Sequence, residues 1–254
     1  IKMIGYSTKN KIIYVIQLVF IIAISVSGVI YTRKYCDMQQ GMCMYSYMDI
    51  YINSVCIDIN IITASQIFLI IYLINMDYIL SPNIIVRLNE RENILWRILR
   101  SGAAESLLYG MISLVVCVLT GTLMKEQYSS GRLCNYNMPN SIYYMFAGKT
   151  DNHIALTVLR IAAILICSIF LRYIIGIIVS LIVRKKSYIL VISIIINVLL
   201  SVRHIFNING ETQYFIYKIY TDTTESLIAL SVMMIVIVVC IISAKILIGK
   251  KDWI

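Results

Sequence analysis

Prolines are nearly absent from this sequence, since its 254 residues contain only two. Neither Pro82 nor Pro139 lies within a long apolar stretch, so no long helix is expected to be kinked by a proline. Charged residues are also scarce, at 14% against about 25% in soluble domains, while hydrophobic residues reach 60%. A chain of this size has too much surface to bury so many Ile, Leu and Val side chains in water. The composition therefore excludes a soluble domain, a coiled coil and a disulfide-stapled miniprotein, and it indicates a protein whose main solvent is lipid.

The motifs that carry common enzyme chemistry are missing as well. The sequence has two histidines, His153 and His204, and no His-Glu-x-x-His, Cys-x-x-Cys or Gly-x-Ser-x-Gly pattern. Hydrolysis by paired carboxylates inside a membrane requires two acids deep in the apolar stretches, and only Asp58 is clearly placed there. We therefore expect no catalytic residue, no metal site and no cofactor in this chain. An intramembrane enzyme and a membrane receptor or signalling protein are the alternatives from other functional classes.

Long apolar runs are what the sequence has in abundance. A transmembrane helix needs about 20 mostly apolar residues to cross the hydrocarbon core, and six stretches reach or approach that length. A transmembrane β-barrel would instead show alternating segments of about 10 residues. The predicted spans are Ile12–Tyr31, Val55–Met76, Ala103–Met124, Ile154–Val183, Tyr188–Phe206 and Leu227–Ile248. We predict an all-α polytopic membrane protein with a single transmembrane domain and six transmembrane helices.

The first and fifth predicted spans each allow a second interpretation. The first apolar run is about 20 residues long, which exceeds the apolar region of a signal peptide, so we expect a retained span. The fifth carries Asn197, Ser201, Arg203 and His204 in its second half. This span either crosses the membrane briefly or breaks before the far interface.

Basic residues set the orientation of the predicted spans, because cytoplasmic loops carry an excess of Lys and Arg. Most of the 22 Lys and Arg residues flank the spans on one side, above all in the segments Arg87–Arg100, Arg184–Lys186 and Lys245–Lys251. Both termini are therefore predicted to lie in the cytoplasm. The net charge of +9 is interpreted as this orientation signal, and no nucleic-acid partner is expected.

The cysteines of the predicted outer loops define no disulfide. Cys36, Cys43 and Cys134 lie on the outer side, where a disulfide is chemically permitted. Three cysteines leave one unpaired, and their spacing selects no pairing.

The predicted spans contain several charged residues, and three of them, Asp58, Arg160 and Arg172, are candidates for a functional role. An ionised side chain within a span costs several kcal/mol unless it is paired or hydrated. One interpretation is a polar lining for a transport pathway. The other is a structural ion pair, such as Asp58 with Arg160, combined with snorkelling of the long side chains. Arg172 reaches the midplane of the membrane if the fourth span ends at Val183.

The cytoplasmic segment between the second and third spans has the pattern of an amphipathic helix over residues 84–100. Helical periodicity places Leu95, Trp96 and Leu99 on one apolar arc. The opposite, basic side includes Arg87, Arg91, Arg97 and Arg100. Such a helix either lies along the inner membrane surface, attracted by anionic lipid, or docks onto a soluble partner.

This topology resembles the permease subunits of bacterial type-2 ABC exporters. Val86-Arg87-Leu88, followed by Arg91 and by Leu95-Trp96, is similar to the Arg-x-x-x-Arg plus Trp pattern of small Firmicute permeases that export or protect against antimicrobial peptides. In that family the segment is the coupling helix, which sits in a cleft of the ATPase. The residues that the resemblance assigns to this contact are Arg87, Arg91, Trp96, Arg97 and Arg100.

The resemblance implies a multi-pass permease of the bacterial plasma membrane that exports or expels an amphipathic substrate, such as a bacteriocin-like peptide. Because the chain has no nucleotide-binding domain, ATP and Mg would be bound by a separate cytoplasmic ABC ATPase dimer, and this chain itself is not an enzyme. A second permease chain, identical or related, would complete the pathway. Gly102, Ser106 and Gly110 repeat at helical spacing at the head of the third span, where they serve contact within the bundle or with that second chain.

Overall fold

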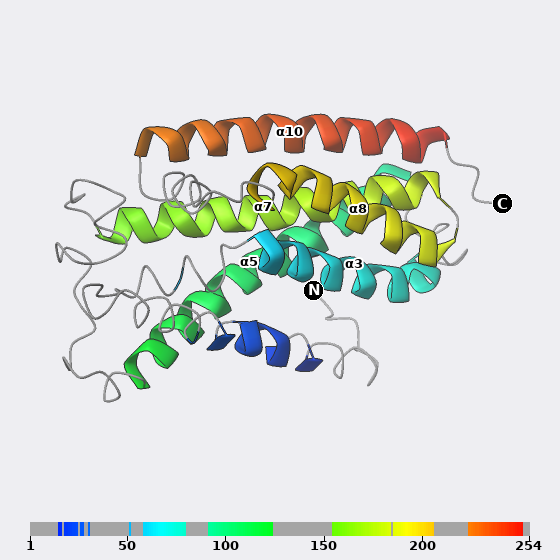
Figure 1. Cartoon of the computed structure of the whole chain (residues 1–254). Coiled ribbons are helices and arrows are strands. Elements are labelled where there is room, and N and C mark those ends of the chain that lie inside the picture. The colour runs from blue at the N-terminus through cyan, green and yellow to red at the C-terminus, as the bar shows by residue number, and fades with distance from the viewer. Residues whose placement is uncertain are drawn as a thin grey trace.

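The structure is a computed structural model, and the residues that it describes are almost entirely helical (Figure 1). The described residues are 15–16, 18–24, 26–27, 30, 51, 58–79, 91–123, 154–183, 185–205 and 223–250. Side chains are described for somewhat shorter stretches of the same helices.

Long helices occupy most of the described part of the chain. They are α3 (Asp58–Ile79), α5 (Arg91–Leu123), α7 (Ile154–Ile182), α8 (Lys186–Ile205) and α10 (Thr223–Lys250). The described positions between residues 15 and 30 are also helical, within the first predicted span. Each later predicted span coincides with one of the long helices, and the largest difference is at α5, which begins at Arg91 and not at Ala103.

Three of these helices are long and apolar enough to cross a membrane, over Asn93–Leu119, Val158–Ile182 and Thr223–Gly249. Within the described residues, Asn60–Ile74 and Lys186–Leu200 form shorter apolar helices. The predicted all-α architecture is therefore confirmed for the described part of the chain, and three of its helices have the length and composition of membrane spans. Of the six predicted spans, three are supported by length and composition, and the other three stay predictions.

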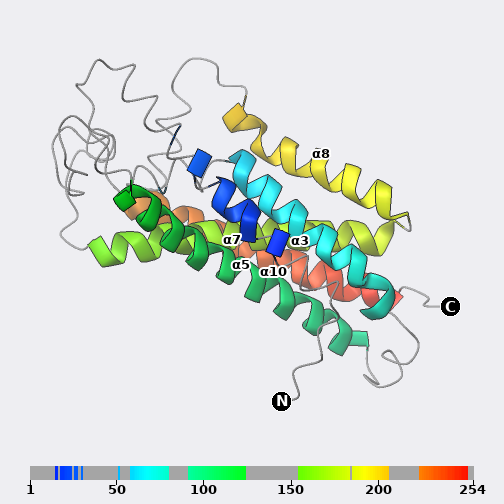
Figure 2. The same cartoon turned by 90° about the horizontal axis from the view of Figure 1, so that it is seen from below.

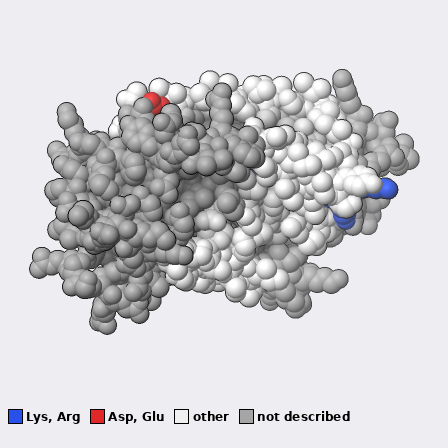
Figure 3. All heavy atoms as spheres, viewed as in Figure 1, with Lys and Arg blue, Asp and Glu red and all other residues white. Residues whose placement is uncertain are grey.

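Helix α7 lies at the centre of the bundle, where it contacts α3, α5, α8 and α10. Ile161, Leu165 and Ile169 of this helix are completely buried. Successive helices alternate in direction, so the ends of α3, α7 and α10 gather with the starts of α5 and α8 at one end of the bundle (Figures 1 and 2). On the face drawn in Figure 3, Lys and Arg lie at this end and an acidic residue lies at the opposite end.

Small residues allow α5 and α7 to pack closely. A side chain at Gly102 would overlap the ring of Tyr173, and a Cβ atom at Gly110 would lie 2.8 Å from Cγ1 of Ile166. Ser106 is completely buried on the same face, and its hydroxyl donates to the Gly102 carbonyl at 2.8 Å. Of the two uses predicted for this small-residue stripe, the structure shows contact within the bundle.

The outer surface of the bundle is apolar, most clearly along α10. The side chains of this helix that are more than half exposed include Leu227, Ile228, Val232, Ile235, Val239, Ile242 and Ile246. A continuous apolar surface of this length is unfavourable in water and is compatible with lipid. The surface therefore agrees with the membrane character that the composition indicates.

Candidate functional site

Helix α8 turns its polar side toward the interior of the bundle. Ile189, Ser193 and Asn197 are spaced one turn apart and are all completely buried. Its exposed side chains between Val191 and Leu200 are all apolar and include Ile194, Ile195, Val198 and Leu199. A surface helix of a water-soluble protein shows the reverse arrangement. The inward position of the two polar side chains therefore marks a polar region in the core of an otherwise apolar bundle.

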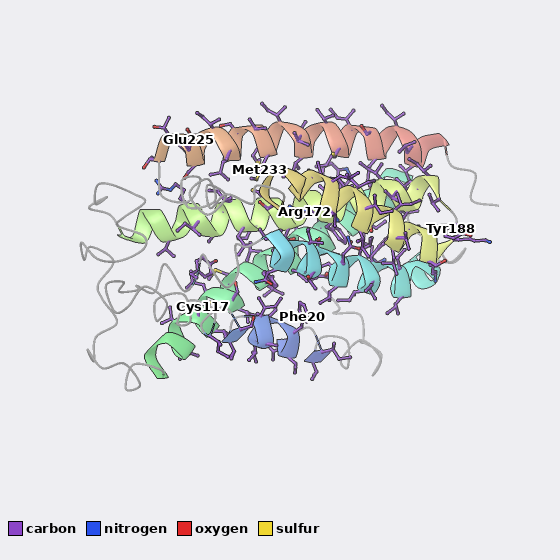
Figure 4. The ribbon with its side chains drawn as sticks, in the orientation of Figure 1. Phe20, Cys117, Arg172, Tyr188, Glu225 and Met233 are labelled. Atoms are coloured by element: carbon purple, nitrogen blue, oxygen red, sulfur yellow. The ribbon has the colours of Figure 1, made fainter. Side chains whose placement is uncertain are left out.

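Hydrogen bonds join this polar side of α8 to α3 and α7. The Ser193 hydroxyl donates to Oε1 of Gln66 at 3.0 Å, and Nη1 of Arg172 donates to the backbone carbonyl of Asn197 at 2.9 Å. Gln66 is buried, and Arg172 is half-buried. Figure 4 shows Arg172 where α7 passes α8. We refer to Gln66, Arg172, Ser193 and Asn197 as the polar cluster.

The polar cluster lies near half the depth of a bilayer core. By helical rise, Arg172 is about 15 Å before the end of α7 at Ile182. Asn197 is about 16 Å beyond the start of α8 at Lys186. The hydrocarbon core is about 30 Å thick, so both positions correspond to its middle if these helix ends mark the membrane surface. The end of α7 at Ile182 agrees with the predicted span end at Val183.

Asn197 is the residue of the polar cluster whose side chain is not satisfied. Neither its Nδ2 nor its Oδ1 has a hydrogen-bond partner in the described part of the chain. A buried amide without partners costs about 1–3 kcal/mol in proteins. Such a group is retained where water, a ligand or a functional requirement compensates for this cost.

Arg172 brings a fixed positive charge to the same place, because a guanidinium group does not lose its proton in proteins. The cluster thus combines a cation with two amides and a hydroxyl. These groups offer donors from Arg172 and both donors and acceptors from Asn197. The arrangement is suited to binding and orienting a polar group, and it contains no nucleophile paired with a base.

Arg160 lies elsewhere in the bundle. Its Nη1 donates to Oγ1 of Thr223 at the start of α10, and the side chain is buried. By helical rise, Arg160 and Arg172 are about 18 Å apart along α7, so the structure does not bring the two arginines together. Asp58 begins α3, but its side chain lies outside the described residues. The ion pair of Asp58 with Arg160 stays a prediction, and Thr223 is a partner that the sequence did not suggest.

The predicted amphipathic helix is continuous with the third span. Helix α5 runs without a break from Arg91 to Leu123, while residues 84–90, Arg87 among them, lie outside the described residues. The buried residues at its start are Ile94, Leu95, Ile98 and Leu99. Trp96 is 49% exposed, so the predicted arc that grouped it with Leu95 and Leu99 is wrong. The buried face is formed by two pairs of residues at i, i+4 spacing, Ile94 with Ile98 and Leu95 with Leu99. Trp96 projects away from this face.

The exposed face of α5 changes from polar to apolar along its length. Near the start of the helix, Asn93, Trp96 and Arg100 are exposed and Arg97 is half-buried, and these residues share one face at i, i+3, i+4 and i+7. We call these four residues the head stripe. The exposed residues further along include Ala103, Ala104, Leu107, Leu108, Met111, Val115 and Leu119. The change coincides with the predicted start of the third span at Ala103. The side chain of Arg91 lies outside the described residues.

Sequence reasoning noted Asn197 only as a polar residue in the fifth span, and it missed Gln66 and Ser193. One signal was available, because Ser193 and Asn197 are four residues apart in an otherwise apolar stretch and therefore share a face. No comparable signal marked Gln66, because α3 contains two other amide residues, Asn60 and Asn75. The outer cysteines Cys36, Cys43 and Cys134 lie outside the described residues.

Comparison of the chain with known protein families, with curated proteins and with solved structures gives no match.

Proposed function

We propose that this chain is the membrane-spanning permease subunit of a bacterial type-2 ABC exporter, driven by a separate cytoplasmic ATPase dimer. The observation that carries the proposal is the continuity of α5. One helix of 33 residues bears an exposed polar head and an exposed apolar body. Since it has no proline and no break, a displacement of its head moves its membrane part as well.

The head stripe has the chemistry of a docking surface. Trp and Arg are the residues most enriched among those that dominate protein–protein binding energy, and the stripe contains exposed Trp96 and Arg100 beside half-buried Arg97. The opposite face of the same turns is buried in the bundle through Ile94 and Ile98. The partner would therefore push on a helix that is firmly attached to the rest of the chain.

Movement of α5 would reach the other helices mainly through α7, and α5 also contacts α10 and α3 directly. Gly102 and Gly110 bring α5 into close contact with α7, and α7 contacts α3, α8 and α10. Closure of the ATPase dimer around ATP would thus rock the helices as packed bodies, a known form of coupling between distant sites. The pathway would run between this chain and a second permease chain, and the cargo would be an amphipathic peptide, as the resemblance implies.

Affinity purification of the chain from its native membranes tests this proposal. We expect vanadate-sensitive ATP hydrolysis in the purified complex, and we expect Arg97→Glu combined with Arg100→Glu to remove both the ATPase subunit and the activity. The matched control is Lys185→Glu, an exposed basic residue at the same end of the bundle, which should retain both. An ATPase that stays fully associated with the double variant would refute the docking role of the head stripe.

A further inference from the structure

We infer that the polar cluster is a binding site for a neutral group that both donates and accepts hydrogen bonds. Water and the backbone amide of a peptide share this chemistry. The inference that water occupies the site rests on its geometry alone. The inference that a peptide binds there rests also on the function proposed above. The site is formed by Asn197 with Gln66, Ser193 and Arg172 around it.

The polar groups around Asn197 are engaged with one another and leave its side chain unmatched. The Ser193 hydroxyl lies 3.0 Å from both Gln66 Oε1 and the Leu190 carbonyl. Nη1 of Arg172 donates to the main-chain carbonyl of Asn197 and not to its side-chain amide. An asparagine inside a membrane bundle normally bonds across to a neighbouring helix. Here Nδ2 and Oδ1 are both buried and have no partner among the described residues, so a guest molecule completes the site.

The unsatisfied atoms define the chemistry of the guest. Nδ2 is a donor and Oδ1 is an acceptor. An anion offers only acceptors, so it would satisfy Nδ2 and leave Oδ1 facing another acceptor. A cation would satisfy Oδ1 and leave Nδ2 without an acceptor. Water satisfies both atoms, and buried waters typically make two to four such bonds. A peptide group also satisfies both, through its carbonyl and its N–H, and the charge of Arg172 favours the carbonyl end of that dipole on its side.

Solid-state NMR of the full chain in liposomes tests the site directly. The sample is labelled with ¹⁵N-asparagine, and the rate of magnetisation transfer from water to the side-chain amide of Asn197 is measured. The Asn197 signal is assigned as the one that is missing in the Asn197→Leu variant. The dry reference is an Ile195→Asn variant, because residue 195 lies at a similar depth on the exposed apolar face of the same helix. The hydrated reference is the side chain of Asn93, which is exposed at the head of α5.

We expect transfer to Asn197 to be several-fold faster than to the asparagine at position 195. A second measurement adds N-acetyl-leucyl-leucinamide to the liposomes. A shifted Asn197 signal with slower transfer from water would identify a peptide amide as a guest, and an unchanged signal would identify water as the guest. Transfer as slow as at position 195, with no shift on adding the amide, would overturn the site. No ATPase takes part, so this outcome is distinct from failure of the exporter proposal.

Discussion

The two sides of α7 make contacts of different kinds. Toward α5 the contact is close, with Gly102 and Gly110 leaving room for Tyr173 and Ile166. Toward α3 and α8 the contact is equally close at Gly176, which lies against Leu69, but it also includes hydrogen bonds, between Tyr72 Oη and Ser180 Oγ at 3.4 Å and from Arg172 Nη1 to the Asn197 carbonyl at 2.9 Å. Packing against glycine permits one fit, whereas hydrogen-bonding groups can exchange partners. The comparison suggests that α5 is fixed to α7 on one side and that the adaptable, ligand-binding part of the bundle lies on the other.

The largest effect is expected from filling the space at Gly102. In Gly102→Val the new side chain would overlap Tyr173, whose buried ring packs edge-on against Tyr72 with centroids 6.4 Å apart and has little room to move. We expect a loss near the upper end of the range of about 1–3 kcal/mol that overpacking costs. The measurement is unfolding by SDS in mixed micelles. Gly249→Val is the control, since nothing lies within 4 Å of that position. Equal stability of the two variants would refute the close α5–α7 contact.

Removal of the charged donor on the other side of α7 should have the next largest effect. Arg172→Ala loses the 2.9 Å bond to the Asn197 carbonyl, and hydrogen bonds to charged groups contribute about 2 kcal/mol. Arg172→Lys keeps the charge and a donor, so it should lose less in the same unfolding assay. An Arg172→Ala protein as stable as the wild type would mean that the polar cluster does not help to hold α7 and α8 together.

A smaller effect is expected for the neutral hydrogen bond between α3 and α8. The cycle of Gln66→Ala, Ser193→Ala and the double variant isolates the 3.0 Å contact of these side chains. Hydrogen bonds of this type between membrane helices average about 0.6 kcal/mol. We expect a coupling energy of that size from SDS unfolding, and additive single effects would show that the two side chains do not interact.

The smallest effect is expected for the hydrogen bond to a thioether between α7 and α10. The Ser168 hydroxyl donates to the sulfur of Met233 at 3.4 Å, and a thioether is a weak acceptor. Figure 4 shows Met233 on α10. Ser168→Ala should change the free energy of unfolding by less than about 0.5 kcal/mol. A loss larger than the coupling energy of Gln66 with Ser193 would show that the hydrogen bond to the thioether is not the weaker of the two contacts.

The positions of the helices were predictable, because a run of about 20 apolar residues is a local signal. Which side of α5 is buried could not be predicted from the sequence. Ile94 and Ile98 compete with Trp96 for the place beside Leu95 and Leu99 on the apolar face, and contacts with distant helices decide between them. Arg172 stood out because a charge inside a span is costly. Gln66 and Ser193 did not, because their pairing depends on which faces of α3 and α8 meet, and this is a long-range property of the bundle.

Native mass spectrometry of the complex extracted from its own membranes tests the exporter proposal most directly. We predict an assembly that contains this chain, a second permease chain of the same or a related sequence, and two nucleotide-binding ATPase subunits. Arg97→Glu combined with Arg100→Glu should reduce that mass by the two ATPase subunits and leave the permease pair. A native assembly with no nucleotide-binding subunit would contradict the proposal.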